Sequence, residues 1–411
     1  MKLSDLEHKR ILIAGYGREG RATEQFLKSR VPSAELAVTD ISYGRDYLAD
    51  QNRYDFVIRT PSIPVPSITA RHTTATNIFF ANVPNIKIGV TGTKGKSTTS
   101  TLIYHILSTA GRAVHLVGNI GNPMLEEIMK PYGEDDIFVC ELSSYQLEDI
   151  GYTPQISVIL NLYPEHMDHH GSVESYYAAK RTLLAYADRD SVFIYNPSFL
   201  TLTRWAAEFP GITKPFAPDL PFDTAGIPLL GKHNLDNIRA AYTAAKQFGI
   251  DDEVIEKAVK TFTPLRHRLQ NVGEYRGITF FDDAISTTPQ STIEAIESVG
   301  TVGVIMLGGL DRGYDFSELA AVLATHKIPH IVLFPHSGAA IRREIMNRGG
   351  YQPSFFETSD MKEAVEYAYK HASAGTVCLL STASPSYSIW KNFEEKGDLF
   401  QKYVTELGKP V

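Results

Sequence analysis

Short runs rich in β-branched residues alternate with helical patterns along the whole chain, and this alternation constrains the fold more than any other feature. Strands that are separated by helices assemble into parallel sheets with helices on their faces, whereas sandwiches and bundles repeat one kind of element. The sequence therefore predicts an α/β protein. Its 411 residues, at roughly 150 residues per domain, predict two to three domains with ligand-binding clefts between them.

Three segments repeat the alternation, and we expect domains at residues 1–84, 85–264 and 265–411. The first has predicted strands at Arg10–Tyr16, Glu35–Asp40, Tyr54–Arg59 and Asn77–Val83. The second has them at Asn85–Gly92, Ala113–Val117, Ile137–Leu142, Ile156–Leu162 and Ser191–Tyr195, followed by helical patterns at Asn234–Phe248 and Asp252–Thr261. The third has them at Gly277–Asp282, Val302–Leu307, His330–Phe334 and Thr376–Ser381. We expect Rossmann-like first and third domains around a P-loop ATPase-like domain.

Charge and composition exclude several classes of protein. The 40 Lys and Arg against 47 Asp and Glu leave a net charge of −7, and no basic run could follow a nucleic-acid backbone. Cys140 and Cys378 lie in separate apolar runs, which excludes a disulfide scaffold and indicates a reducing compartment. The charged start has no signal-peptide core, and no apolar stretch approaches the ~20 residues of a membrane span. We expect a cytoplasmic monomer that binds no nucleic acid.

A glycine-rich motif with Gly15, Gly17 and Gly20 follows the first predicted strand and opens a helix, and Asp40 ends the next strand. Such glycines allow a tight turn and let backbone N–H groups approach a pyrophosphate at a helix N-terminus. The motif indicates binding of a dinucleotide or a nucleotide diphosphate. By itself it would suggest a dehydrogenase, and a turn that only allows close helix packing is the other interpretation.

A second motif has the residue types of a phosphate-binding loop. It reads Gly92, Thr93, Lys94, Gly95, Lys96, Ser97, Thr98, after an apolar strand and before a helical stretch. The spacing is shorter than the common G-x-x-x-x-G-K-[ST], but backbone N–H groups can still form an anion nest. Lys96 can neutralise β/γ-phosphate charge, and the Ser97 hydroxyl can bind Mg²⁺. We predict an ATP site here, and two nucleotide sites make a simple dehydrogenase improbable.

Carboxylates and imidazoles follow two later strands of the same segment. Glu141 to Gln146 follow one strand, and Glu165 to His170 follow the next. Because ligands of open α/β sheets bind at the carboxyl ends of strands, these groups are candidates to hold Mg²⁺ or Mn²⁺ near a triphosphate. A solvated loop is the alternative for the histidines, and Lys180 would then be a surface lysine.

The third segment carries polar motifs at predicted strand ends and loops, where a small acidic substrate would bind with Arg268 and Arg312 as cations. These motifs are His267-Arg268, Asp282–Thr288, Gly308–Gly313 and Ser381–Ser388. Taken singly, each is more often an ordinary turn.

In chain order these motifs resemble those of the Mur ligases over essentially the whole chain, and within that family the type that adds glutamate to UDP-N-acetylmuramoyl-L-alanine. The pieces that carry the resemblance are T-G-T-K-G-K-S-T at Thr91–Thr98, G-N-I-G at Gly118–Gly121, E-L-S-S-Y-Q-L-E at Glu141–Glu148, E-H-M-D at Glu165–Asp168 with A-A-K ending at Lys180, G-x-H-N-x-x-N at Gly231–Asn237 and N-F-E-x-x-G at Asn392–Gly397.

The resemblance implies a role for each motif. The first domain would hold the UDP part of the substrate, rather than NAD, through Gly15, Gly17, Gly20 and Asp40. The middle domain would hold ATP and two Mg²⁺ ions, one near Ser97 and Glu141 and the other near His166 and a carbamylated Lys180. Asn119, Ser143 and Gln146 would contact the substrate, and Asn234, Arg268 and Asp283 would contact ATP. Thr287, Arg312, Ser386 and Phe393 would contact the amino acid.

The implied reaction belongs to peptidoglycan precursor synthesis. ATP would phosphorylate the terminal carboxylate of the muramoyl-alanine substrate, because a carboxylate is a poor electrophile. The amine of glutamate, deprotonated with help from His166 or a nearby carboxylate, would then attack the acyl phosphate and expel phosphate. Lys96 and the metal ions would offset the negative charge of both reactants.

Three positions depart from the glutamate-adding pattern. The third domain usually reads D-S-K-A-T-N, but Ile285 stands in place of the lysine. Arg312 stands where the G-G-D-K-G-type loop has lysine, which keeps the charge and changes the geometry. Ser62 stands where the S-P-G-I loop has glycine. The missing lysine removes one cation from the implied glutamate pocket, so D-glutamate is favoured from family frequency alone, and L-glutamate is the alternative.

Two other functions fit parts of the sequence. A folylpolyglutamate-synthase-like ligase shares the central chemistry, but this chain starts with the nucleotide-binding motif. A nucleotide-sensing protein that has lost turnover is the alternative from another class. The presence of Lys96, Glu141, His166 and Lys180 argues against it, since a sensor would not need the second metal site.

Overall fold

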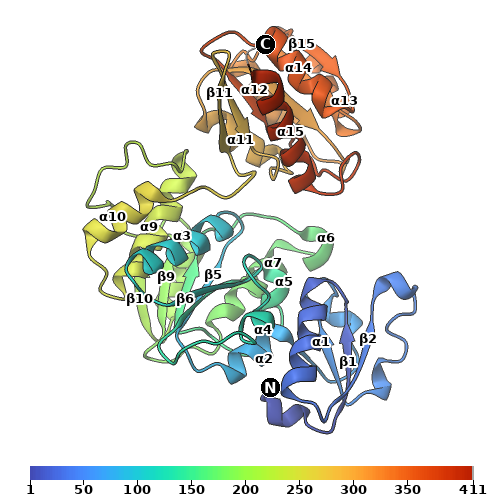
Figure 1. Ribbon diagram of the computed structural model, residues 1–411, viewed down its shortest axis with the longest axis vertical. Coiled ribbons are helices and arrows are strands. Elements are labelled where there is room, and N and C mark those ends of the chain that lie inside the picture. The colour runs from blue at the N-terminus through green and yellow to red at the C-terminus, as the bar shows by residue number, and fades with distance from the viewer. Residues whose placement is uncertain (410–411) are drawn as a thin grey trace. The chain divides into compact units, whose positions relative to one another are not determined.

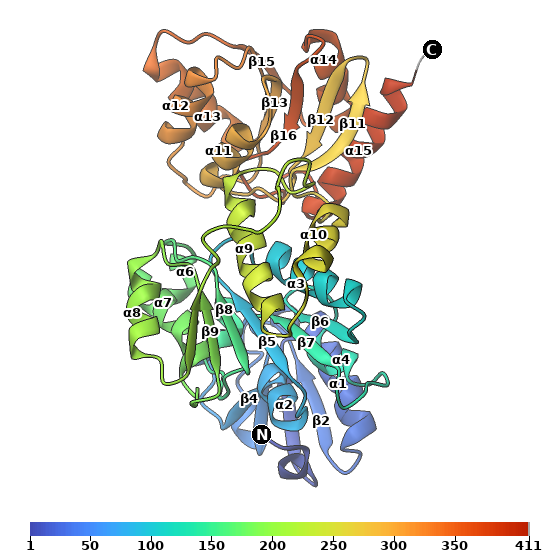
Figure 2. The same ribbon diagram turned by 90° about the vertical axis from the view of Figure 1, so that its left-hand side faces the viewer.

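The computed structural model describes residues 1–409, apart from the side chain of Asp168. The chain forms two compact units. Met1–Ile227 and His233–Phe262 form the first, and Pro228–Lys232 with the chain from Thr263 onward form the second. Three sheets with helices on their faces confirm the α/β prediction (Figures 1 and 2). The exact residue limits of the three predicted domains stay a prediction.

The first sheet has the order β2-β1-β3-β4, and all its strand pairs are parallel. Its strands are β1 (Arg10–Ala14), β2 (Glu35–Thr39), β3 (Phe56–Arg59) and β4 (His72–Thr74). Helix α1 (Arg18–Arg30) follows β1 after a tight glycine turn and packs against β1 and α4 (Met124–Glu127) (Figure 1). The glycine motif therefore lies between a strand and a helix, as the sequence predicts.

The second sheet, also in the first unit, is parallel and has the order β10-β9-β8-β5-β7-β6. Its strands are β5 (Lys87–Thr91), β6 (Val114–Gly118), β7 (Ile137–Glu141), β8 (Ile156–Ile159), β9 (Val192–Tyr195) and β10 (Ile212–Pro215). The chain builds β6 and β7 on one side of β5 and then crosses to β8 on the other side. The strand order reverses at β5, which is where open α/β sheets bind ligands at their carboxyl edge.

The first unit also contains helices between and after these strands. They are α2 (Ala75–Asn82), α3 (Lys96–Thr109), α5 (Ser144–Leu147), α6 (Met167–His170), α7 (Val173–Arg181), α8 (Leu200–Glu208), α9 (Lys232–Lys246) and α10 (Asp252–Thr261). One apolar cluster joins both sheets of this unit, and within it the rings of Phe79 and Phe138 meet edge to face at 5.3 Å.

The third sheet has the order β11-β12-β16-β13-β14-β15. Its strands are β11 (Gln270–Tyr275), β12 (Ile278–Asp282), β13 (Val302–Gly308), β14 (His330–Phe334), β15 (Ser354–Glu357) and β16 (Val377–Leu380), and only the β11–β12 pair is antiparallel. Alternate residues of β13 face opposite cores. Ile305 packs with α11 (Pro289–Ser298), α12 (Ser317–Thr325) and α13 (Ser337–Arg348), whereas Met306 packs with α14 (Met361–His371) and α15 (Phe393–Gly408).

One predicted element is wrong. The apolar run predicted as the strand Asn77–Val83 forms helix α2. The Thr74 hydroxyl accepts a hydrogen bond from the Asn77 backbone N–H and caps this helix, and residues 75–80 are all buried. A short apolar run that is buried on every side has no periodicity that separates a helix from a strand. Among residues 1–409, every helix is too short or too polar to cross a lipid bilayer.

Candidate active site

The phosphate-loop residues form a preshaped turn between β5 and α3. Gly92 and Gly95 have φ angles of +154° and +84°, which suit glycine. Asn161, just beyond β8, clamps the turn because its Oδ1 accepts from the Lys94 backbone N–H at 2.8 Å and its Nδ2 donates to the Lys94 carbonyl at 3.0 Å. The Thr93 N–H donates to the Asn161 carbonyl at 3.1 Å. The loop conformation is therefore fixed by a residue that follows the neighbouring strand.

Gly95 also has no space for a side chain. A Cβ at this position would lie 2.2 Å from Asn237 Oδ1 on α9. Asn237 is held there by bonds from its Nδ2 to Asn234 Oδ1 at 2.8 Å and from Thr99 Oγ1 to its Oδ1 at 3.2 Å. The predicted ATP residue Asn234 therefore belongs to the same polar cluster as the loop.

Replacing Gly95 with alanine is expected to raise the KM for ATP about tenfold. The left-handed φ costs a side chain about 1–2 kcal/mol, and the new methyl must push Asn237 away. Gly111→Ala is the matched control, because Gly111 has φ +76° but no atom within 4 Å of its would-be Cβ. Steady-state kinetics over an ATP series measure the effect, and equal KM values for the two variants would contradict it.

Two lysines converge on one carbonyl of the loop. Lys96 Nζ donates to the Gly92 and Thr93 carbonyls at 3.0 and 2.9 Å. Lys180 Nζ, from α7, donates to the Gly92 carbonyl at 2.9 Å. Lys180 is 1% exposed, so it is not the surface lysine of the alternative interpretation. Burial, and then the charge of Lys96, hold the pKa of Lys180 well below its usual range, although Glu165 opposes them.

Glu141 lies at the end of β7, where it pairs in register with Val90 just before the loop. Its side chain is fully buried, and its Oε1 accepts from Asn119 Nδ2 at 2.7 Å. Its Oε2 is buried and has no hydrogen-bond partner among the residues that the structure describes. Because leaving a buried carboxylate oxygen unpaired is costly, this atom fits a cation. Ser97 lies in the first turn of α3, which starts from the same loop.

His166 stands beside the loop with a positive φ of 60° and precedes α6. Its Nδ1 lies 3.1 Å from the Tyr145 hydroxyl, and its Nε2 lies 3.8 Å from Glu165 Oε2. Glu165 pairs with Lys94 at 2.6 Å. Burial acts to raise the pKa of Glu165, but Lys94, His166 and Lys96 outweigh it and lower that pKa. The carboxylate thus stays ionised beside the phosphate loop.

A pocket of about 200 Å³ lies at the glycine motif of the first sheet and the strand ends of the second. Its lining includes three predicted substrate residues, Asn119, Ser143 and Gln146, and the residues Arg18, Glu19, Pro61, Gly118 and Pro123. Ser143 and Gln146 cap α5 reciprocally, so their side chains are fixed. A larger hollow of about 470 Å³ beside α7 and α8 is lined by none of the predicted site residues.

The glycine motif itself is tightly packed. A Cβ on Gly15 would lie 1.8 Å from Thr60 Oγ1, and a Cβ on Gly20 would lie 2.0 Å from the Gly15 carbonyl oxygen. Gly17 meets no atom and precedes α1. Asp40 Oδ2 accepts from the Tyr16 backbone N–H at 2.7 Å, and this bond, followed by those from Ser42, lowers the pKa of Asp40. Close packing thus explains two of the three glycines, and Gly17 leaves open space at the helix N-terminus.

Two site residues could not be found by motif. Asn161 carries only the weak signal that it follows a strand end. Glu19 occupies a variable position of the glycine motif, yet burial raises its pKa to about 7 against the opposing effects of Arg59 and Gln146. Glu19 lines the pocket at the glycine motif, and Asn161 holds the phosphate loop from outside it.

The second unit holds the other predicted residues. Asp283 is buried and accepts hydrogen bonds from the Leu269 N–H at 3.1 Å and from Ser381 Oγ at 2.7 Å, and burial raises its pKa to about 7. Arg312 is exposed after β13, and Arg268 and Thr287 are half-buried. Phe393 begins α15 and meets His267 edge to face. Ser386 is buried, and its Oγ has no hydrogen-bond partner within residues 1–409.

Sequence reasoning missed Lys396 in this unit. It is fully buried, and its Nζ donates to Thr382 Oγ1 at 2.6 Å. Burial lowers its pKa to about 7, opposed by Asp282 and Asp283. Lys396 is a variable position within the N-F-E-x-x-G motif, so only its place in the fold distinguishes it. It provides a buried amine in a unit where Ile285 takes the place of the expected lysine.

Comparison with known proteins finds two domain patterns and full-length relatives. The Mur ligase middle domain matches residues 90–214, and the Mur ligase, glutamate ligase domain matches residues 267–383. A UDP-N-acetylmuramoyl-L-alanine–L-glutamate ligase of Micromonospora sp. is 31% identical over 100% of both chains. A UDP-N-acetylmuramoylalanine–D-glutamate ligase of Acetivibrio thermocellus is 31% identical over 94% of this chain and 90% of its own.

Solved structures share the fold. MurF ligase of Thermotoga maritima in complex with ADP superposes with a TM-score of 0.64 at 15% identity, over 98% of this chain and 97% of its own. UDP-N-acetylmuramate-alanine ligase MurC of the same organism has a TM-score of 0.64 at 16% identity, over 97% of this chain and 100% of its own. At such identities the likeness concerns the fold alone.

Proposed function

This chain belongs to the Mur ligase family, and on that premise we propose that it joins glutamate to UDP-N-acetylmuramoyl-L-alanine with ATP as the energy source. The chain is an ATP-dependent amide-bond ligase of peptidoglycan precursor synthesis. The observation that carries the proposal is the full-length match to glutamate ligases, together with a phosphate loop bounded by Lys96, Lys180 and a buried Glu141.

We propose that Gly92 to Thr98 hold the ATP phosphates, with Asn234, Arg268 and Asp283 at the rest of the nucleotide. The same loop offers fitting ligands for two Mg²⁺ ions, with Mn²⁺ as a substitute. Ser97 and Glu141 would hold one, because the buried Glu141 Oε2 lacks a partner among the described residues. His166 and a carbamylated Lys180 would hold the other. The ions would supply positive charge beside the phosphates.

Carbamylation suits the place of Lys180. A neutral amine reacts with CO₂, forming an N–C bond and releasing one proton, and burial favours the neutral amine at this position. The product carries a negative charge instead of a positive one. That change would replace the repulsion between Lys180 and Lys96 with an attraction, and it would give the buried site an anionic oxygen ligand.

The chain's own residues would then guide two steps. Lys96 would hold the γ-phosphoryl group while the substrate carboxylate attacks it, which yields the acyl phosphate and ADP. A carboxylate beside His166, such as Glu165, would accept the proton of the glutamate amine. Tyr145 lies at His166 Nδ1 and fixes the ring, which leaves Nε2 for the ion. The amine then attacks the acyl carbon, and phosphate leaves. Asn119, which binds Glu141, would link the substrate pocket to the phosphate loop.

The UDP-muramoyl end of the substrate would follow the glycine motif. Gly15, Gly17, Gly20 and Asp40 would hold the UDP part, and Asn119, Ser143 and Gln146 the part nearer the reacting carboxylate. The pocket near the glycine motif supports this arrangement, because it places Arg18 close to three of those residues. Thr287, Arg312, Ser386 and Phe393 would hold the amino acid, and Lys396 offers a buried amine in the same unit.

A purified-protein assay tests the function directly. Phosphate release should require ATP, UDP-N-acetylmuramoyl-L-alanine and glutamate together, and omission of any one should leave only background release. ATP turnover that does not depend on the muramoyl substrate would contradict the ligase function. A protein that binds nucleotide without any release would favour the sensor interpretation.

The stereochemistry of glutamate needs a separate measurement. We expect D-glutamate to be preferred, since it is the substrate of most glutamate-adding members, although relatives named for each form match at 31% identity. Exchanging the positions of the side chain and the α-carboxylate would let the same cations bind the L form. Parallel assays with D-glutamate, L-glutamate and D-aspartate at equal concentration decide the question. A clear preference for L-glutamate would overturn the stereochemical proposal and leave the reaction intact.

A further inference from the structure

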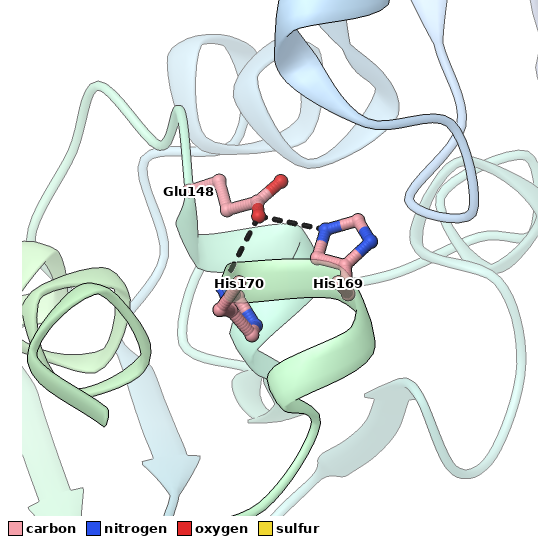
Figure 3. Close-up of side chains that lie close together, drawn as sticks. All are labelled: Glu148, His169 and His170. Atoms are coloured by element: carbon pink, nitrogen blue, oxygen red, sulfur yellow. Dashed lines mark hydrogen bonds and ion pairs between the residues drawn. The ribbon is translucent and has the colours of Figure 1, made fainter. Parts of the chain in front are cut away.

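Three potential metal ligands meet beside α6, outside the proposed ATP site. They are Glu148, which follows α5, and His169 and His170, the last residues of α6 (Figure 3). Glu148 Oε1 lies 2.7 Å from His169 Nε2 and 3.3 Å from His170 Nδ1. We call these residues the imidazole–carboxylate cluster.

The spacing of the cluster suits a tetrahedral cation. Metal–ligand bonds of about 2.0–2.2 Å place neighbouring ligand atoms roughly 3.3 Å apart. The three candidate ligand atoms all lie within 4.8 Å of one another. Figure 3 shows both histidines in contact with one carboxylate oxygen of Glu148. Small side-chain rotations would therefore open room for an ion between the carboxylate and the two rings.

The surroundings hold these ligands in place. His170 is 2% exposed at its side chain, and its other ring nitrogen lies 3.0 Å from Ser144 Oγ. Such a partner at the far nitrogen is what orients a metal-binding histidine. The Tyr145 ring packs against His169 at 4.3 Å and against His170 at 5.6 Å between centroids. The cluster is thus a built site and not a set of mobile surface groups.

The local charge also favours a cation. Glu148 Oε2 is buried without a hydrogen-bond partner among the described residues and lies 3.9 Å from Arg59 Nη1. Arg59 is already paired with Asp149, at 2.7 Å. One guanidinium therefore faces two carboxylates, and one negative charge remains for the cluster. The direct contacts of the two histidines with Glu148 Oε1, at 2.7 and 3.3 Å, are the arrangement that a bound ion would replace.

We propose that Glu148, His169 and His170 bind one divalent transition-metal ion, with Zn²⁺ as the best fit. Two imidazoles and one carboxylate are a ligand set that suits Zn²⁺, and a water completes the tetrahedron. Mg²⁺ prefers an all-oxygen octahedron, so it would compete poorly. The site shares no residue with the two proposed catalytic metal sites. It also fixes α6, the helix that begins directly after His166, so the bound ion is a positioning element for that side chain.

The test uses the full chain in metal-free buffer without nucleotide, so it does not depend on ligase activity. Co²⁺ is the probe, because its visible absorption becomes intense in a four-coordinate site, and Zn²⁺ then displaces it. We expect one equivalent of Co²⁺ with tetrahedral absorption in the wild type, retained in excess Mg²⁺. Zn²⁺ should bleach the absorption with the same stoichiometry and raise the melting temperature.

Two ligand variants and two control variants locate the site. His169→Gln and Glu148→Gln each remove one ligand and should weaken Co²⁺ binding by at least about 100-fold, since losing a group that only orients a ligand already costs roughly 10–100-fold. His169 is chosen over His170 because its side chain is more exposed, 10% against 2%. His166→Asn removes a proposed catalytic ligand and should leave the absorption unchanged. His105→Gln, on α3 far along the chain, is the matched histidine control.

Three results would overturn the proposed metal site. Co²⁺ that shows no tetrahedral absorption in the wild type rules out the site. Equal binding by the wild type and folded His169→Gln does the same. Loss of binding in His166→Asn alone would assign the ion to the proposed catalytic site and reject this one. A failed ligase assay would not change the interpretation of these metal-binding measurements, because they are made without nucleotide or substrate.

Discussion

Lys96→Ala is expected to lower the rate of phosphate release by at least about 10³-fold while the protein stays folded. Removing one preorganised positive donor costs roughly 3–4 kcal/mol in the transition state, and Lys96 acts on the group that is transferred. Its ammonium donates to the Gly92 and Thr93 carbonyls of the loop and not to an apolar core, so the free energy of unfolding should change by less than about 1.5 kcal/mol.

The measurement combines steady-state phosphate release with thermal and chemical unfolding. Lys130→Ala is the matched control, because Lys130 is half-exposed, forms an ion pair with Glu127 and belongs to none of the predicted sites. The control should retain its turnover. Near-normal turnover of folded Lys96→Ala would remove the basis for the phosphate-loop assignment.

Periodic features made most of the fold predictable from sequence. His330–Phe334 and Asp252–Thr261 were predicted at their observed limits, because each is a run of one pattern with clear ends. The short strands β4, β10 and β15 were not predicted, because three or four residues at a sheet edge are too few to show alternation. Helix α2 was mistaken for a strand because burial on all sides hides the helical period.

Residues of the candidate site were predictable from the sequence only where they belong to a motif of fixed spacing. The phosphate loop is predictable from Gly92, Gly95 and Lys96, because the turn itself requires glycine and lysine at this spacing. Asn161 and Lys396 belong to no such spacing. Their contacts join elements that are distant in the chain. Asn161 joins the loop after β8 to the loop after β5, and Lys396 joins α15 to the loop after β16. A pattern along one segment carries no information about such contacts.

The role of Lys180 gives the second large prediction. Lys180→Ala is expected to lose nearly all turnover, on the order of the loss in Lys96→Ala, because the site would lose an anionic ligand beside the loop. Acetate or formate should restore part of the activity. The truncation leaves a small space next to the Gly92 carbonyl, where the lysine Nζ now lies, and a small carboxylate can bring an anionic oxygen there.

Lys180→Met separates the chemical role from packing. Methionine fills nearly the same buried volume without a charge, so this variant should fold at least as well as the alanine variant. Acetate should not restore its activity, because the methionine side chain leaves no space for the carboxylate. Rescue of Lys180→Ala together with no rescue of Lys180→Met is the pattern that an anionic Lys180 requires. Full turnover of either variant without additive would contradict this role. The Lys180 amine that donates to Gly92 would then only support the loop, and the second metal ion would have to be held by His166 and Glu165 alone. Charge is what separates these outcomes, because a lysine with a purely structural role could be replaced by methionine as well as by an alanine with a bound carboxylate.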